Sequence, residues 1–276
     1  MKKAIGFMKG HPLFTGIIGV TIGVAATKIF VENTIGRIAY MRIILALAMC
    51  TFVYLISGEK SFEKCHKTTG YVFKWGLLTI IPEMLMLLGF LFILVSGNTN
   101  VAAGWPLRVL LAVIACVFVG LFEELTFRVT INDALLYRFR NNKNIFVWIA
   151  IISCLVFGAV HVISGKIFGS PATLGMAALK ILSSALCGLC WLILYWKTRN
   201  VWGIALIHAL CDFTTFLQSA LTETQVSLGG AENYTGANAG GLGVYLFQIV
   251  FGLVFVIILW KKVGKTIDFD EIRKTW

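Results

Sequence analysis

The sequence predicts an all-α protein, a polytopic membrane helix bundle of about eight transmembrane helices with both termini in the cytoplasm. The composition, the apolar stretches and the placement of basic residues lead to this prediction. Hydrophobic residues make up 58% of the chain, charged residues only 13%, and the mean hydropathy is +0.86. Soluble domains carry about one quarter charged residues. The composition therefore indicates an integral membrane protein in a lipid bilayer.

Apolar stretches long enough to cross the bilayer recur along the whole chain. A spanning helix needs about 20 mostly apolar residues, and such stretches lie at 13–31, 37–57, 73–96, 105–131, 145–164, 172–196, 201–220 and 242–260. The alternating segments of about 10 residues that are typical of membrane barrels do not occur. Because lipid cannot satisfy free backbone groups, each stretch is expected to be a helix. The first stretch lacks a small-residue cleavage site, so we expect it to be retained.

The Lys and Arg residues are divided unevenly between the two sides of the predicted bundle. With a cytoplasmic N-terminus, seventeen of the 24 fall on the cytoplasmic side. The opposite side holds five, namely Arg37, Arg42, Arg108, Lys166 and Lys180. This asymmetry follows the positive-inside rule and supports an even number of spans with both termini cytoplasmic. It also accounts for the net charge of +11 without a nucleic-acid partner.

We expect a single integral membrane domain over residues 1–276. The one stretch that resembles a linker, 222–241, is rich in Gly, Asn and Thr and lacks Lys and Arg, which predicts a flexible extracytoplasmic loop. The seven cysteines lie mostly inside apolar stretches, with Cys65 in a cytoplasmic loop, and do not indicate a disulfide framework. Cys187 and Cys190 are interpreted as small helix-packing residues.

Three charged residues interrupt the fourth apolar stretch, in the segment GLFEELTFRV. Ionised groups in the bilayer core are costly, so their presence indicates a functional site. Glu123 and Glu124 are adjacent and lie about 100° apart around a helix, so they face different surroundings. Glu124 and Arg128 have the spacing and order of a favourable helical ion pair. Glu123 has no local cation, which favours its use as a general base, with Glu124 as its structural neighbour.

Two histidines lie in later apolar stretches, and each has a partner one helical turn away. Phe157 precedes His161 by four residues, so its ring can pack against the imidazole. Asp212 follows His208 by four residues, which makes a polar pair on one helix face. Together with the two glutamates, these side chains are hard to explain unless they converge in one site.

The ordered set Glu123-Glu124-x-x-x-Arg128, Phe157-x-x-x-His161 and His208-x-x-x-Asp212 resembles the three motifs of the CPBP family of intramembrane proteases, also called the Abi or CAAX prenyl protease 2-like family. The resemblance covers about residues 105–220, the expected catalytic core. It implies hydrolysis of a peptide bond by a glutamate-activated water, without a cofactor.

The resemblance also implies a role for each motif residue. Glu123 would activate the water, assisted by His161, while Glu124, Arg128 and Phe157 would give structural support. His208 and Asp212 would face the developing oxyanion. The third motif usually ends in Asn rather than Asp, and an ionised aspartate cannot donate a hydrogen bond, so we expect Asp212 to orient His208.

Other chemistries remain open at this point. Glu123, His161 and His208 also form an acceptable zinc-ligand set, although no His-Glu-x-x-His motif is present. Carboxylates and histidines inside a membrane also occur in proton-coupled transporters, but internal repeats are not apparent in this chain. Glu83, after Pro82, would fit such a relay or a kinked helix with a carboxyl facing a polar interior. A membrane scaffold is the third alternative.

The expected substrate is a membrane-associated peptide or protein. Bacterial relatives in the family are linked to peptide maturation and bacteriocin self-immunity. A small, Lys-rich membrane protein of this kind is expected in the bacterial cytoplasmic membrane.

Overall fold

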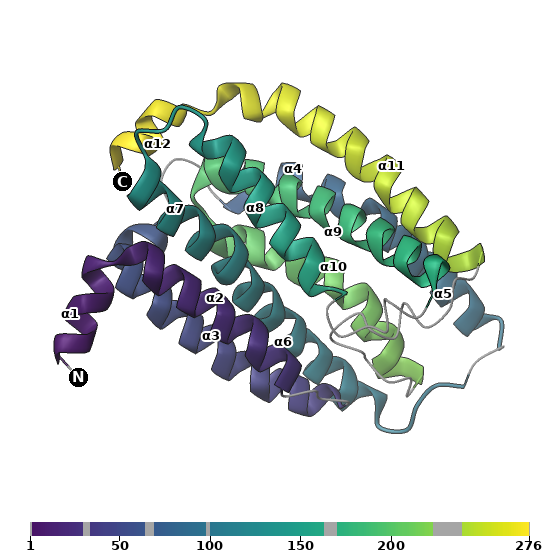
Figure 1. Ribbon diagram of the computed structural model, residues 1–276. Coiled ribbons are helices and arrows are strands. Elements are labelled where there is room, and N and C mark those ends of the chain that lie inside the picture. The colour runs from purple at the N-terminus through teal and green to yellow at the C-terminus, as the bar shows by residue number, and fades with distance from the viewer. Residues whose placement is uncertain are drawn as a thin grey trace.

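Helices make up the regular structure of the chain (Figure 1). The computed structural model describes residues 2–29, 34–63, 69–97, 100–162, 170–222 and 239–275, and these ranges contain no strand. This confirms the all-α prediction. The α-helices are α1 (Lys2–Gly10), α2 (Pro12–Ile29), α3 (Ile35–Ser57), α4 (Thr69–Gly76), α5 (Ile81–Val95), α6 (Trp105–Glu124), α7 (Ile131–Phe139), α8 (Ile145–Val160), α9 (Pro171–Thr198), α10 (Val201–Thr222), α11 (Ala239–Lys262) and α12 (Phe269–Thr275).

Each predicted apolar stretch is largely helical. Among the described residues, six segments are long and apolar enough to cross a membrane: Ile35–Ser61, Thr69–Val95, Trp105–Phe139, Pro171–Thr198, Val201–Thr222 and Gly241–Thr266. The number is seven if α1 and α2, which meet at 104°, form one span. Helix α8 is apolar but has only 16 residues. The chain is thus a multi-pass membrane helix bundle, while eight spans and cytoplasmic termini stay predictions.

The bend between α1 and α2 has a local cause. Pro12 is the first residue of α2. Proline has no backbone N–H and disfavours the helical conformation of the residue before it, so a helix ends ahead of it. The first apolar stretch therefore forms a helix of its own and does not continue α1.

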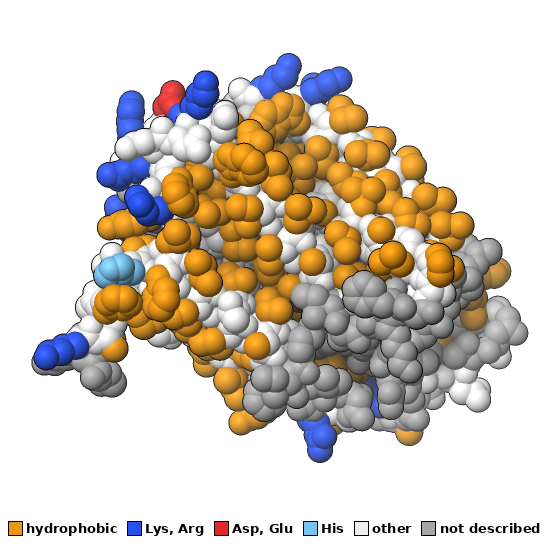
Figure 2. All heavy atoms as spheres, in the orientation of Figure 1, with side chains coloured by type: hydrophobic (Ala, Val, Ile, Leu, Met, Phe, Trp, Pro, Cys, Tyr) orange, Lys and Arg blue, Asp and Glu red, His pale blue; other side chains and the backbone are white. Residues whose placement is uncertain are grey.

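The outer surface agrees with a membrane environment. Figure 2 shows hydrophobic side chains spread over the visible face and Lys and Arg side chains gathered near the end that carries α12. Exposed Arg138 and Lys261 belong to the segments at this end. Arg273 Nη2 donates to the carbonyl of Lys143 at 2.8 Å, which joins α12 to the connection between α7 and α8. Segments predicted to be cytoplasmic therefore lie together.

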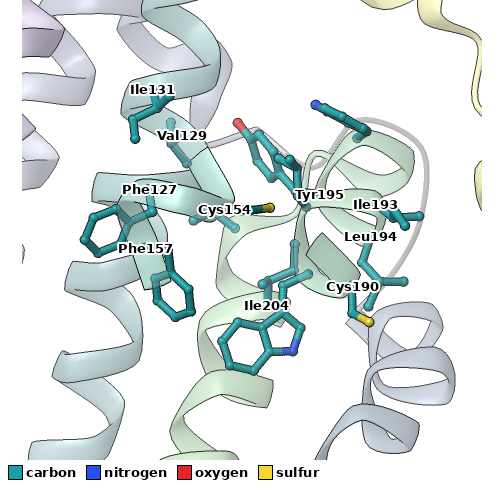
Figure 3. Close-up of a cluster of buried hydrophobic side chains, with 14 of the residues drawn as sticks. Phe127, Val129, Ile131, Cys154, Phe157, Cys190, Ile193, Leu194, Tyr195 and Ile204 are labelled. Atoms are coloured by element: carbon teal, nitrogen blue, oxygen red, sulfur yellow. The ribbon is translucent and has the colours of Figure 1, made fainter. Parts of the chain in front are cut away.

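The largest hydrophobic core lies around α9 (Figure 3). Phe127 and Phe157 meet edge to face with their ring centroids 5.3 Å apart. Trp191 is almost fully buried and donates from Nε1 to Thr79 Oγ1 at 3.0 Å. Cys190 packs in the same core, as the sequence analysis proposed, and the described cysteines are free thiols. Cys65 and nearly all of the predicted loop 222–241 lie outside the described residues.

A cluster of buried polar side chains lies beside the core near the start of α10. Arg199 Nη2 lies 3.2 Å from Asp133 Oδ1, and Ser61 donates to the other carboxylate oxygen. Asn132 donates to Asp133 Oδ1 at 2.8 Å and accepts from Trp196 Nε1 at 2.8 Å. Arg199 is one of the seventeen basic residues assigned to the cytoplasmic side. It is buried, because Asp133 supplies a partner from a distant helix.

Candidate active site

The paired glutamates lie where α6 changes its helical geometry. Glu123 and Glu124 end α6, and a six-residue π-helix, Leu125–Thr130, connects it to α7. A π-helix leaves backbone groups less regularly paired than an α-helix and is frequent at functional sites. Here Ser153 Oγ of α8 donates to the carbonyl of Phe127 at 2.7 Å. This bond anchors the π-helix to the neighbouring helix.

Arg128 lies within the π-helix and is fully buried. Its Nε atom is 3.3 Å from Glu124 Oε2, which confirms the predicted ion pair. The guanidinium lies over the Phe157 ring at 3.9 Å and near the Trp191 ring at 5.3 Å. Gly188 makes room for it, because an added Cβ would lie 2.8 Å from Arg128 Nη2. One ion pair and two aromatic faces therefore hold this cation.

Glu124 also binds His208. Its Oε1 atom lies 2.7 Å from His208 Nδ1. An ionised carboxylate can only accept, so Nδ1 carries the proton of this bond. The imidazole also packs against Trp191, with the ring centroids 4.3 Å apart and the ring planes tilted by 35°. The short orienting contact to His208 thus comes from Glu124 on α6, whereas the sequence analysis expected it from Asp212.

The second nitrogen of His208 faces two further carboxylates. Nε2 lies 3.6 Å from Glu123 Oε2 and 3.6 Å from Asp212 Oδ2. Both distances exceed a hydrogen bond, and neither oxygen has a hydrogen-bond partner among the described residues. The two side chains are 15% and 26% exposed. They can therefore accept hydrogen bonds from a small molecule that enters between them.

His161 follows the last residue of α8. Its Nδ1 atom donates to the carbonyl of Phe157 at 2.7 Å, and its ring meets the Phe157 ring edge to face at 4.7 Å. The predicted contact between these residues is confirmed. Because a carbonyl can only accept, this tautomer leaves Nε2 unprotonated and able to accept a proton. His161 also interacts electrostatically with Glu123.

These helices enclose a cavity of about 110 Å³. Both histidines and Asp212 line it, so the structure brings two of the three motifs to one space. A cavity of about 150 Å³ admits benzene in another protein, so this one can take a few waters or a small side chain. Other lining residues are Phe157, Ser183, Ser184, Cys187, Trp191 and Cys211.

The same cavity has polar lining residues that the motifs do not include. Glu83 lines it beside Pro82 and accepts from Gln248 Nε2 at 3.2 Å, so its carboxyl faces a polar interior. Lys180 also lines it. The sequence analysis placed Lys180 outside the membrane, but the residue lies within the long apolar helix α9, nine residues after its start.

The zinc alternative receives no geometric support from this arrangement. Zinc needs its ligand atoms about 2.0–2.2 Å from one point. The described residues contain no group of three or more His, Cys, Asp or Glu side chains that could hold a metal ion. A zinc site made by Glu123, His161 and His208 would therefore require rearrangement.

Sequence reasoning missed Arg42. The residue was assigned to the outer side as a topology marker, but it is buried within α3 with 7% of its surface exposed. Its guanidinium interacts electrostatically with Glu123 and Asp212. A signal was available, because an apolar run of eight residues follows Arg42 directly.

Fold and site together define a membrane-embedded helix bundle with a buried Glu, His and Asp centre. Residues 104–214 match the family model described as Rce1-like, a type II CAAX prenyl endopeptidase. The matched segment contains every motif residue from Glu123 to Asp212. This match agrees with the resemblance drawn from the motifs of the chain. No curated protein and no solved structure matches the chain significantly.

Proposed function

We propose that this protein is a glutamic intramembrane endopeptidase, which hydrolyses a peptide bond of a membrane-associated peptide or protein. One observation carries the proposal. His208 Nε2 lies 3.6 Å from both Glu123 and Asp212, beside a cavity that His161 also lines. These residues come from three helices of a membrane bundle. The family match over residues 104–214 supports the protease class, and the arrangement favours water activated by a carboxylate.

In this mechanism a water enters between Glu123 and the scissile carbonyl. Glu123 accepts a proton from the water as the oxygen attacks the carbonyl carbon, and His161 provides a second acceptor nearby. The proton on Glu123 then passes to the leaving amine when the carbon–nitrogen bond breaks. Water, peptide bond and products balance without a redox step or a metal.

His208 serves the developing oxyanion in this proposal. Glu124 fixes the proton on Nδ1 and so sets the orientation of the ring. A second proton on Nε2 points to the region between Glu123 and Asp212, where negative charge forms in the transition state. Arg128 holds Glu124 in place, so the ion pair supports the reaction through His208.

The substrate class is proposed from the location of the site. The cavity is enclosed by membrane helices, so a segment anchored in or at the bilayer reaches it most directly. We propose peptide maturation or bacteriocin immunity as the physiological setting and the bacterial cytoplasmic membrane as the location.

The test is cleavage of a quenched peptide library by detergent-purified protein, with and without a metal chelator. The proposal expects two product peptides whose masses sum to the substrate plus one water, at a rate that the chelator does not change. Chelator-sensitive cleavage would favour a zinc enzyme. If folded wild-type protein cleaves neither soluble nor membrane-anchored peptides, the protease proposal is contradicted and a transporter or scaffold gains support.

A further inference from the structure

Arg42 is a buried cation that has no ion pair within the described part of the chain. It lies seven residues after the start of α3, about 10 Å along the helix. Its Nη1 atom is buried and has no hydrogen-bond partner among the described residues, and no carboxylate of these residues lies within 4.0 Å of its guanidinium. Burial of an unpaired charge in a membrane protein is costly and marks a functional group.

The guanidinium is placed beside the site by packing. Its Cζ atom lies 5.1 Å from the centre of the Phe122 ring, and Phe122 directly precedes Glu123. The ring is almost fully buried, so it fixes one side of the guanidinium. A cation over an aromatic face is stabilised without losing its ability to donate in other directions.

Helices α3, α6 and α10 share one hydrophobic cluster, which fixes their faces relative to each other. Its members include Ile38, Ala39, Cys116, Val119 and Ala209. Arg42, Glu123 and Asp212 each follow a member by three or four residues, so they lie on the same faces of their helices. The guanidinium accordingly interacts electrostatically with both carboxylates.

In the proposed reaction the negative charge of Asp212 opposes the oxyanion, and the positive charge of Arg42 can offset it. Glu123 and Asp212 both lie 3.6 Å from His208 Nε2, the atom assigned to the oxyanion. An ionised Asp212 would repel that oxyanion, and Glu124 already engages the other side of the imidazole. The ion pair with Glu124 occupies Arg128. Of these two arginines, Arg42 has no ion pair with any residue that the structure describes.

We propose that Arg42 is a positioning residue that offsets the charge of Asp212 and so lowers the repulsion that the oxyanion meets at His208. This inference rests on the proposed peptide hydrolysis for its catalytic consequence. Arg42 acts through Asp212 and does not itself carry a reacting atom. The proposal therefore makes the effect of Arg42 depend on the charge at position 212.

A double-mutant cycle tests this dependence. The four proteins are wild type, Arg42→Gln, Asp212→Asn and the double variant, compared on a cleaved peptide with kcat and KM measured separately. Arg42→Gln is expected to reduce kcat about 100-fold when Asp212 is present, and less than about tenfold when Asn replaces it. Equal factors in both backgrounds would overturn the proposal.

Two further variants separate charge from packing. Arg42→Lys keeps the charge and is expected to retain more activity than Arg42→Gln, so an equal loss counts against the proposal. Arg37→Gln removes an exposed arginine of the same helix and is expected to leave kcat unchanged.

Thermal unfolding of the same four proteins gives a readout independent of activity. Arg42→Gln should lower Tm more in the wild-type background than beside Asp212→Asn, since only in the wild-type background does it remove a counter-charge from an ionisable group at position 212. If no protein hydrolyses peptides, the proposed function fails while this cycle still decides the role of Arg42. If Arg42→Gln then lowers Tm equally in both backgrounds, the proposed role of Arg42 is overturned.

Discussion

Glu124 shows how one residue can connect a structural pair to a reacting group. Its two carboxylate oxygens contact different helices, with Arg128 at 3.3 Å and His208 at 2.7 Å. The cation fixes the carboxylate, and the carboxylate fixes the tautomer of the imidazole. Supporting residues of this kind hold a catalytic group in its working orientation.

This connection predicts a combined loss of activity and stability in Glu124→Gln. The amide cannot hold the ion pair, so Arg128 is left as an uncompensated buried charge, which costs about 3–5 kcal/mol in comparable cases. We expect hydrolysis to fall by about 10²–10⁴-fold as His208 loses its orientation. The measurements are initial rate and thermal unfolding in detergent.

Glu63→Gln provides the matched control, because Glu63 is exposed. It should change neither quantity. A Glu124→Gln protein that unfolds and hydrolyses like wild type would contradict the supporting role of Glu124.

The sequence predicted contacts within helices better than contacts between them. The pairs of Glu124 with Arg128 and of Phe157 with His161 follow from a spacing of four residues, which is fixed once the segment is helical. The contact of Glu124 with His208 depends on how α6 packs against α10, and spacing contains no such information. The position of Arg42 beside Phe122 likewise depends on how α3 packs against α6.

At the scale of helices, the close approach of α6 and α10 brings the motifs together. At Gly120 an added Cβ would lie 2.5 Å from the carbonyl oxygen of Ala205 and 3.0 Å from the nitrogen of Ala209. The two helices therefore meet backbone to backbone, as small residues allow in membranes. Gly120 lies one turn before the glutamates, so any separation here moves Glu124 away from His208.

Gly120→Ala is expected to destabilise the protein by about 1–3 kcal/mol through overpacking. It should also reduce hydrolysis, although it removes no polar group. Thermal unfolding and initial rates check both effects.

Gly89→Ala is the matched control in another apolar helix, α5, where an added Cβ meets nothing within 4 Å. There the alanine should be neutral or slightly stabilising. Equal effects of the two alanines would refute the close-contact explanation.

The π-helix after Glu124 could not have been predicted from the apolar pattern. It inserts a wider turn into a long membrane segment, and every residue of Leu125–Thr130 is buried, including the polar Thr126, Arg128 and Thr130. A segment that is buried on all sides has no amphipathic periodicity that distinguishes i→i+5 from i→i+4 bonding. The sequence showed that a helix passes here, but it did not show how the helix is wound.

At the scale of the whole molecule, the composition predicted the fold class, and the placement of basic residues predicted the orientation of the protein in the membrane. Predicted cytoplasmic segments lie at one end in the structure, joined by Arg273 and the carbonyl of Lys143. At α6, Ala102 donates to the carbonyl of Leu221 at 2.6 Å, which ties the start of that helix to the end of α10. The first hydrogen bond lies just after the C-terminal end of α7, and the second lies just before the N-terminal end of α6.

Cysteine labelling tests the orientation. In a cysteine-free background, Val101→Cys is expected to react with a membrane-impermeant thiol reagent on intact cells. Lys143→Cys and Lys262→Cys should react only after permeabilisation, because positively charged segments stay in the cytoplasm. Labelling of all three positions from one side would contradict the topology.

The most direct test of the central claim is the rate of peptide hydrolysis by purified Glu123→Gln beside wild type. The substitution keeps the shape of the side chain and removes its ability to accept a proton. We predict a rate lower by at least about 10²-fold in protein that remains folded, since Glu123 Oε2 has no hydrogen-bond partner among the described residues to lose. A folded Glu123→Gln protein that hydrolyses peptides at the wild-type rate would contradict the assignment of Glu123 as the base.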